Sequence, residues 1–138
     1  MEPNTHRALS PRLCGTPVAL FLGGAEVELE TCDEMRADER GLVHGGFIFG
    51  LADYAAMLAI NEPNVVLGSA ETRFLAPSIV GDKLHATARV LSDDGKRRRV
   101  EVHVKRQATA LDERVFEGMF VCFVPSRHVL DSRTAGAP

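Results

Sequence analysis

The most apolar stretch of the chain runs from Gly41 to Asn61. Nearly every position in it is apolar or small, and it has no polar face. A helix that is apolar on all sides is a buried helix, so the stretch predicts a central helix of about five turns that opens at the Gly45-Gly46 pair. It is too short, and too interrupted by glycine and by Asp53, to read as a membrane span.

Alternation of apolar and polar residues marks much of the remaining chain. It is clearest over 84–91 and 99–108, where apolar residues alternate with histidine, threonine and charged residues. Such alternation predicts strands that bury one face. Turn signals at Gly81-Asp82 and at Ser92-Asp93-Asp94-Gly95 separate these runs. The predicted strands are 18–22, 25–30, 65–75, 84–91, 99–108 and 115–124, with a further turn over 109–114.

One apolar helix followed by antiparallel strands is an α+β layout. The sheet must wrap the helix, because nothing else in the chain is apolar enough to bury it. The length of 138 residues predicts a single domain. We place that domain at 16–126, between an N-terminal arm over 1–15 that reads as loose and a partly ordered C-terminal tail over 127–138.

Charge and cysteine content exclude several classes of protein. A net charge of −3 argues against a nucleic-acid partner, which would favour a basic chain. Cys14, Cys32 and Cys122 form no CxxC pair, so we expect neither a disulfide framework nor a metal site. The first eleven residues lack the apolar run of a signal peptide. We therefore expect a cytoplasmic protein without a membrane partner.

Asp53 is the one carboxylate inside the apolar stretch. Burying an unpaired carboxylate is costly, so its presence needs a reason. At the start of the same stretch, Gly45 and Gly46 leave backbone N–H groups unshielded at the positive end of a helix. An anion-binding helix end and a lone acid together suggest a catalytic site. The alternatives are that Asp53 is a structural acid that caps a neighbouring loop, and that the glycines serve only close packing.

Five short motifs stand out along the chain. They are His44-Gly45-Gly46, Leu51-Ala52-Asp53, Asn61, Arg73-Phe74-Leu75-Ala76-Pro77 and Gly81-Asp82-Lys83-Leu84. Together they resemble the hotdog-fold acyl-CoA thioesterases, most of all the phenylacetate-pathway (PaaI-like) branch. The resemblance covers roughly residues 16–124. The spacing of the first two motifs, followed by the last two, is fairly specific for the superfamily but does not specify the substrate.

The resemblance implies a fold, a reaction and an assembly. The fold would be a hotdog, an antiparallel sheet wrapped around one long central helix. The reaction would be hydrolysis of an acyl- or aryl-CoA thioester to the free acid and CoA, with no metal or cofactor beyond the coenzyme A of the substrate. The Gly45 amide would polarise the thioester carbonyl, and Asp53 would be the nucleophile or the general base. The assembly would be a homodimer, often a dimer of dimers.

The chain departs from that family at two positions. Asp38 stands where relatives often have Asn or Gln, which helps to hold the substrate or water. The family's hydroxyl partner on the strand after the helix has no clear counterpart, and Ser69 and Thr72 are the candidates. Together with Asp38, the residues His44 and Gly46 complete the predicted substrate-binding set around the helix start, although His44 reads more as a positioning residue than as a catalytic one.

Helix geometry limits how these residues act together. Thioester hydrolysis needs N–H donors for the developing oxyanion and a carboxylate to attack or to deprotonate water. Gly45 and Asp53 are eight residues apart, about 12 Å along one helix axis. One thioester cannot bridge that distance, so both groups act on it only if they come from two copies of the helix. The site should then lie across a two-fold interface.

The basic run Lys96-Arg97-Arg98-Arg99 is the only dense cluster of positive charge. It is either a solvated hairpin end or a site for the coenzyme A phosphates. If it is only a hairpin end, Arg73 or Lys83 is the next candidate to bind the phosphates. Alternation places Arg98 on the inward face with Val100, and Arg97 and Arg99 on the outward face.

Two other functions fit a hotdog domain. One is a non-catalytic acyl-CoA-binding domain, as in fatty-acid regulators, which would normally follow a DNA-binding helix-turn-helix. The first 15 residues have no room for one. The other is a dehydratase, which is weaker because we find no hydratase-type His/Asp motif. The acyl group, and the choice between CoA and acyl carrier protein, stay open.

Overall fold

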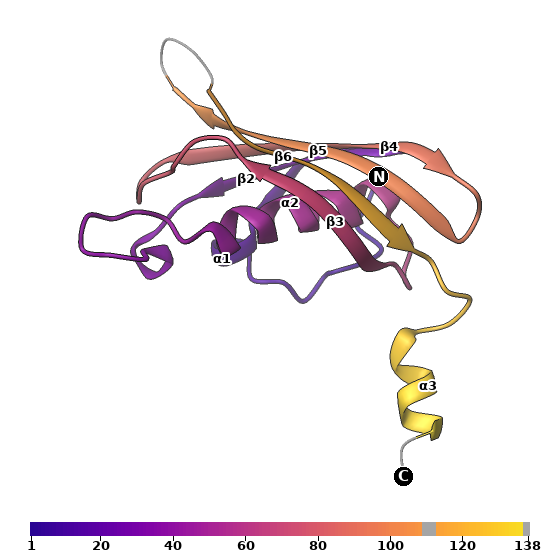
Figure 1. Cartoon of the computed structure of the whole chain (residues 1–138). Coiled ribbons are helices and arrows are strands. Elements are labelled where there is room, and N and C mark those ends of the chain that lie inside the picture. Colours follow the sequence, from indigo (N-terminus) through magenta and orange to yellow (C-terminus); the bar gives the residue numbers. More distant parts are fainter. Residues whose placement is uncertain (109–112, 137–138) are drawn as a thin grey trace.

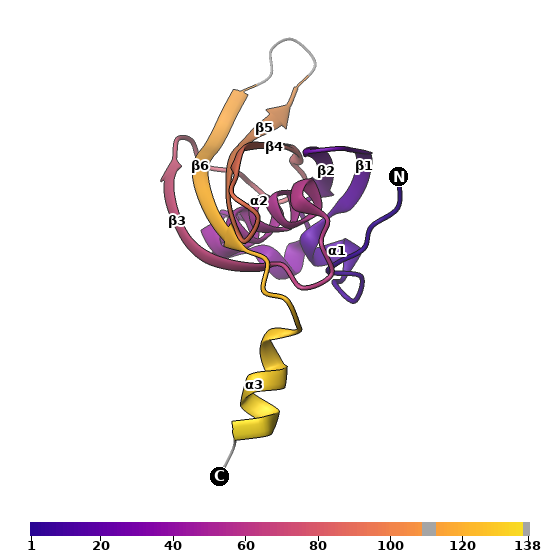
Figure 2. The ribbon, with the colours of Figure 1, turned by 90° about the vertical axis from the view of Figure 1, so that its right-hand side faces the viewer.

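The computed structural model describes residues 1–108 and 113–136. Its main elements are one six-stranded antiparallel sheet and the helix α2 (Gly45–Ile60), which lies against the concave face of the sheet (Figure 1). Viewed after a quarter turn, the sheet curls around this helix (Figure 2). The predicted α+β hotdog layout is confirmed. The predicted turn over 109–114 falls mostly on residues 109–112, outside the described residues.

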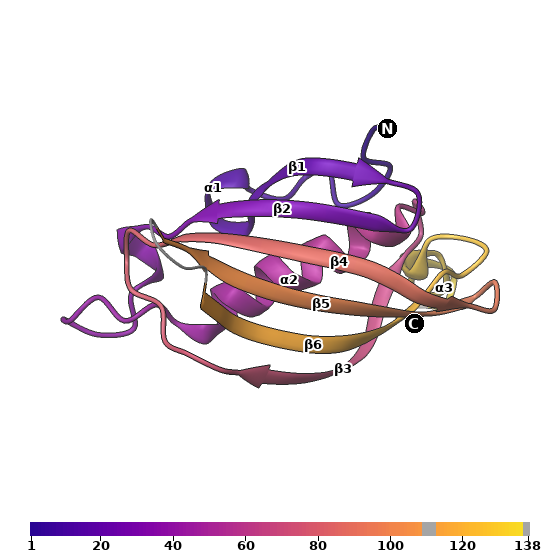
Figure 3. The same cartoon turned by 90° about the horizontal axis from the view of Figure 1, so that it is seen from above.

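The strands lie in the order β1-β2-β4-β5-β6-β3, and every neighbouring pair is antiparallel (Figure 3). The order places β3, the first strand after the helix, at the edge beside the last strand. Each predicted run coincides with a strand, within a few residues at either end. The strands are β1 (Thr16–Phe21), β2 (Gly24–Glu30), β3 (Val66–Phe74), β4 (Lys83–Asp93), β5 (Arg97–Gln107) and β6 (Glu113–Phe123).

The register of the sheet brings its apolar positions together under the helix. Val27 pairs with Ala86, and Val100 pairs with Phe120, and all four side chains are fully buried. The polar residues between them point to the outer face, as alternation requires. Small residues such as Ala86 let the helix approach the sheet closely, so the middle strands and α2 form one apolar core.

Helix α2 begins at the Gly45-Gly46 pair, where the sequence places its start. Residues 42 and 43 before it are held by isolated β-bridges, and the Val43 N–H donates to the Ser78 carbonyl over 2.8 Å. The helix ends at Asn61, whose left-handed backbone lets its N–H donate to the Met57 carbonyl over 2.8 Å. Residues 54–60 are buried on all sides, whereas the first turns are partly exposed.

The two terminal segments are more ordered than the sequence predicts. The N-terminal arm is not loose, because Asn61 holds it: the Asn4 N–H donates to Asn61 Oδ1 over 2.7 Å, and Asn61 Nδ2 donates to the Glu2 carbonyl over 3.0 Å. Thr5 is buried, and the arm includes the short helix α1 (Pro11–Cys14). The tail forms helix α3 (Val129–Gly136), which projects away from the sheet (Figures 1 and 2).

Candidate active site

The N-terminus of α2 opens on a pocket of about 230 Å³. No side chain caps this helix end among the described residues, and its first turn contains no acid. The first N–H groups of a helix have no acceptor within the helix and carry partial positive charge. The pocket therefore offers amide donors to a polar atom in an otherwise apolar space. Its lining residues are Val43, Gly45, Ile48, Phe74, Leu75, Ala76, Pro77 and Ser78.

Gly45 and Gly46 each face a ring that takes the place of a side chain. A Cβ atom on Gly45 would lie 3.1 Å from Cε1 of Phe74, a half-exposed ring that packs edge-on against Phe116 with centroids 5.1 Å apart. A Cβ atom on Gly46 would lie 3.0 Å from Nε2 of His44. Glycine thus leaves room for both rings, and the His44 ring lies over the helix start. The positioning role of His44 stays a prediction.

Asp53 lies on the partly exposed side of α2, one turn beyond Gly50. A Cβ atom on Gly50 would meet nothing within 4 Å, so this side of the helix is open. Oδ1 of Asp53 is nevertheless buried and has no hydrogen-bond partner among the described residues. Burial raises the pKa of Asp53 to about 6. The carboxylate is therefore mostly ionised at neutral pH, and no described residue donates a hydrogen bond to its Oδ1, which suits a base or a nucleophile.

Cys122 lies on β6, near Asp53. The thiol is fully buried, and burial together with the negative charge of Asp53 raises its pKa to about 12. It therefore stays protonated and is not a nucleophile. Gly45 lies beside Phe74, which pairs with Phe116 near the other end of β6. The two candidate groups thus lie at different points along β6, and no carboxylate of the described residues lines the pocket at Gly45.

Asp38 and the two hydroxyl candidates do not converge on this pocket. Oδ1 of Asp38 accepts from the N–H groups of Arg40 and Leu42, at 3.0 and 3.1 Å, and so holds the loop before α2. Ser69 pairs with Val121, on the outer face of the sheet. Thr72 pairs with Gly118 on the inner face, where its methyl group fills the space that glycine leaves. Substrate-binding roles for Asp38 and Ser69 stay predictions.

The basic run divides as alternation predicts. Arg98 lies on the inward face, with 15% of its side chain exposed, and its Nε is 3.0 Å from Asp93 Oδ1. Its Nη2 lies 3.9 Å from Glu62 Oε1 and donates to the Gly95 carbonyl over 3.2 Å. Arg97 and Arg99 are exposed on the other face. Because carboxylates already neutralise Arg98, the two outward arginines are the better candidates for phosphate.

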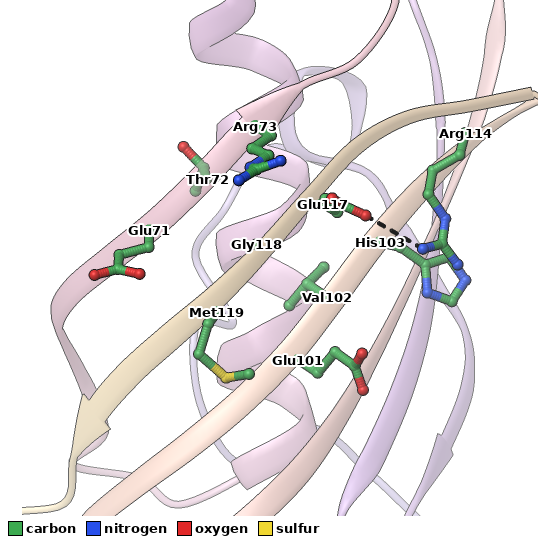
Figure 4. A pocket seen from close by; sticks show the side chains of 10 residues that line it. All are labelled: Glu71, Thr72, Arg73, Glu101, Val102, His103, Arg114, Glu117, Gly118 and Met119. Atoms are coloured by element: carbon green, nitrogen blue, oxygen red, sulfur yellow. Dashed lines mark hydrogen bonds and ion pairs between the residues drawn. The ribbon is translucent and has the colours of Figure 1, made fainter.

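A larger hollow, of about 370 Å³, lies on the outer face of the sheet (Figure 4). Both acidic and basic side chains line it, and Arg114 Nη1 lies 3.4 Å from Glu117 Oε2. Burial and the nearby cations lower the pKa of His103 in this hollow. It contains neither Gly45 nor Asp53, and it lacks the apolar lining that an acyl group needs. We therefore place the candidate site at the smaller pocket.

The described part of the chain contains no group of three or more His, Cys, Asp or Glu side chains placed to hold a metal ion. None of its helices is long and apolar enough to cross a membrane.

A single long helix wrapped by an antiparallel sheet, with the N-terminus of the helix open on an apolar pocket, defines the hotdog class. The chain belongs to the thioesterase superfamily, whose family model matches residues 40–112. This membership agrees with the resemblance in its motifs.

Solved structures of similar proteins share this fold. Protein PH1136 of Pyrococcus horikoshii is 58% identical, with 95% of this chain and 98% of that chain covered and a TM-score of 0.90. Protein smu.793 of Streptococcus mutans UA159, solved bound to acetyl CoA, is 25% identical, with coverage of 89% and 97% and a TM-score of 0.76. The E. coli PaaI protein of the phenylacetic acid degradation operon is 25% identical, with coverage of 78% and 80% and a TM-score of 0.70.

Curated relatives are longer than this chain. Methylthioribose-1-phosphate isomerase of Aquifex aeolicus is 48% identical over 120 residues, which are 87% of this chain but 25% of that protein. Transcription factor FapR of Caldanaerobacter subterraneus is 27% identical over 127 residues, 91% of this chain and 62% of that protein. The chain therefore spans a quarter to about three-fifths of the length of these two relatives.

The structure also identifies two residues that sequence reasoning missed. Ser78 is buried in the lining of the pocket at Gly45, and Cys122 lies near Asp53. For Cys122, alternation with Phe120 along the last strand was a usable signal, because it assigns both residues to the inner face. For Ser78 no periodic signal exists, since it lies in an irregular connection between strands.

Replacing the buried acid should stabilise the fold at high pH. The pKa of Asp53 is higher in the folded protein than in the unfolded chain, so ionisation of Asp53 destabilises the folded state. Asp53→Asn should raise the free energy of unfolding by about 1–2 kcal/mol at pH 8, after allowance for residual solvent contact. The gain should shrink as the pH falls from 6 towards 4. Urea denaturation at pH 8 and pH 5 tests this, with exposed Glu39→Gln as the control. A gain that is the same at both pH values would contradict it.

Proposed function

We propose that the protein is a thioesterase that hydrolyses an acyl- or aryl-CoA thioester to the free acid and CoA. The observation that carries the proposal is the pairing of two features of one helix. Uncapped amides open on an apolar pocket at Gly45, and an unpartnered carboxylate with a pKa of about 6 lies further along at Asp53. The structure solved with acetyl CoA supports a CoA thioester as the substrate class.

In the proposed mechanism, the Gly45 amide donates to the thioester carbonyl oxygen. As the carbonyl carbon is attacked, this donor stabilises the negative charge that develops on the oxygen. Asp53 either removes a proton from the attacking water or attacks the carbon itself to form an anhydride that water then opens. In both routes the C–S bond breaks, its electron pair leaves with the CoA sulfur, and the acyl carbon gains the oxygen of water.

We further propose that each site is shared between two copies of the chain. About 12 Å of helix separates Gly45 from Asp53, and the pocket at Gly45 has no carboxylate of its own. Strand β3 is the outermost strand beyond β6, so its free edge is available for pairing with a second β3. A two-fold dimer formed in this way has two equivalent sites. Further pairing of dimers into a tetramer is the assembly that the family resemblance implies.

An acyl-binding domain without catalysis is the second candidate. The match to FapR, a transcription factor, over most of this chain favours it. The two proposals differ in one measurement: an acyl-binding domain would bind acyl-CoA esters without releasing a free thiol.

Loss of the carboxylate should abolish most of the activity. Asp53→Asn keeps the shape of the side chain and should lower kcat by roughly 100-fold or more, the usual contribution of a general base or nucleophile. In the wild-type protein, kcat/KM should rise with pH around an apparent pKa near 6, because the ionised form is the active one. A screen of acyl-CoA esters with free-thiol detection measures both. Near-wild-type turnover by Asp53→Asn would contradict the assignment of Asp53 as the base or nucleophile.

Mixed subunits should regain activity if the site is shared. Asp53→Asn and Gly45→Val should each be inactive alone, the second because a side chain would press against Phe74 and cover the amide. After unfolding and refolding together, some heterodimers hold one intact site, so the mixture should regain up to about a quarter of wild-type turnover. Mass spectrometry must show that heterodimers form. If they do and no activity returns, each site is built within a single chain.

Neutralising the outward arginines should weaken binding of the nucleotide part of CoA. Arg97→Gln with Arg99→Gln should raise KM for an acyl-CoA roughly 5- to 10-fold with little change in kcat. The effect should shrink at high salt. A pantetheine thioester lacks the nucleotide and should not respond. Arg114→Gln with Arg7→Gln removes the same two charges from exposed positions outside the run and controls for net charge. If KM for the acyl-CoA stays unchanged, the run is a solvated hairpin end.

A further inference from the structure

Among the described residues, Ser78 contributes the only polar side chain that lines the pocket at Gly45. The other lining residues are apolar or glycine. Ser78 is 1% exposed, and its Oγ has no hydrogen-bond partner among the described residues. A buried hydroxyl without a partner is costly, and native proteins nearly always supply one. Such a partner comes from a neighbouring group, a buried water or a bound molecule, and Ser78 lines the pocket in which the acyl group would bind.

The main chain around Ser78 is fixed, so the hydroxyl cannot find a partner by shifting the loop. The Ser78 carbonyl accepts from the Val43 N–H over 2.8 Å. The next two residues are held as well: the Ile79 N–H donates to Asp82 Oδ2 over 3.0 Å, and the Val80 N–H donates to the Gly41 carbonyl over 2.9 Å. Only rotation about the side-chain bond is left to the hydroxyl.

Two other buried polar atoms without a hydrogen bond have a simpler explanation. They belong to Arg98 and His85, whose Nε and Nδ1 lie 3.0 and 4.0 Å from carboxylate oxygens. Both therefore have a charged neighbour even though no hydrogen bond forms. Among the described residues, this leaves Asp53 and Ser78 as the buried groups with no such neighbour. One is the proposed base, and the other lies beside the proposed oxyanion donor.

We propose that the Ser78 hydroxyl binds an oxygen atom on the acyl group, so that the site selects short acyl groups carrying a hydroxyl or keto oxygen over plain alkyl groups. This inference rests on the proposed thioesterase function. If the Gly45 amide holds the thioester carbonyl, the rest of the acyl group fills the same pocket. Its volume of about 230 Å³ accommodates roughly eight water-sized groups. The second oxygen must therefore lie within a few bonds of the carbonyl.

The chemistry of serine fits either kind of oxygen. A hydroxyl donates one hydrogen bond and accepts others, so it can donate to a keto oxygen or exchange bonds with a substrate hydroxyl. The lining around it is apolar, and a single polar group in such a pocket fixes the orientation and identity of a ligand. A net hydrogen bond of this kind changes kcat/KM by about tenfold.

The test compares 3-hydroxybutyryl-CoA and acetoacetyl-CoA with butyryl-CoA, which has the same chain length. The wild-type protein should turn over at least one of the first two about ten times more efficiently than butyryl-CoA. Ser78→Ala should lower kcat/KM for the preferred ester about tenfold more than for butyryl-CoA, so that the preference is lost, and should leave the pH profile unchanged. Ser92→Ala replaces an exposed serine on β4 and is the matched control. It should change neither the preference between the esters nor the pH profile.

Several results would overturn the inference. One is equal efficiency of the wild-type protein on all three esters, which needs no variant. Another is an equal loss on every ester in Ser78→Ala, or a shifted pH profile, because the hydroxyl would then act on the base or on the fold. If Ser78→Ala does not fold, Ser78→Cys keeps the size of the side chain while weakening its hydrogen bond, and it should reduce the preference.

Failure of the proposed function is measured separately. Carba analogues of the same esters, with a methylene group in place of the thioester sulfur, bind without being hydrolysed. If no ester is hydrolysed, calorimetry should still show about tenfold tighter binding of the oxygen-bearing analogue to the wild-type protein than to Ser78→Ala. Equal affinities of the two proteins for that analogue would overturn the inference about Ser78, whatever the outcome of the thioesterase assay.

Discussion

The structure depends on the burial of one helix that has almost no polar surface. Residues 54–60 of α2 are buried on every side, so the sheet must curl around the helix instead of covering one face of it. That curvature requires small side chains where strand and helix meet, and Ala25, Ala86 and Ala88 supply them. A flat sheet would leave much of this helix in water, at a cost of roughly 25 cal/mol for each Å² of apolar surface left exposed.

The same constraint determines where polar chemistry is possible. The sheet covers the second half of α2, whereas its first turns stay partly open. The open part contains both unusual features of the helix, the uncapped glycine amides and the Asp53 carboxylate. A wholly enclosed acid would be expected to remain protonated, and a fully solvated one would keep its ordinary pKa. Partial burial at the edge of the wrapped region gives the pKa of about 6 that suits a base.

Much of the fold was predictable from the sequence because it rests on local periodicity. Alternation over 99–108 predicted the inward and outward faces of β5, including the split between Arg98 and its neighbours. Strand order was not predictable, since nothing local indicates that β3 pairs with β6. The helix start was predictable because the Gly45-Gly46 pair marks it, although nothing local shows that Val43 before it is bonded to Ser78. The ordered arm was missed because it depends on Asn61, a contact across 57 residues.

The residues of the candidate site also differ in whether the sequence predicts them. Gly45 and Asp53 were visible in the sequence, because glycine at a helix start and acid in an apolar stretch are local anomalies. Ser78 was not visible, since a serine in a loop is ordinary until its hydroxyl is found buried without a partner. Helix geometry adds a constraint on how the two groups act: one rigid helix separates the Gly45 amide from the Asp53 carboxylate by about 12 Å. If both act on one thioester, the enzyme is the dimer, and the free edge of β3 is a functional requirement of the fold.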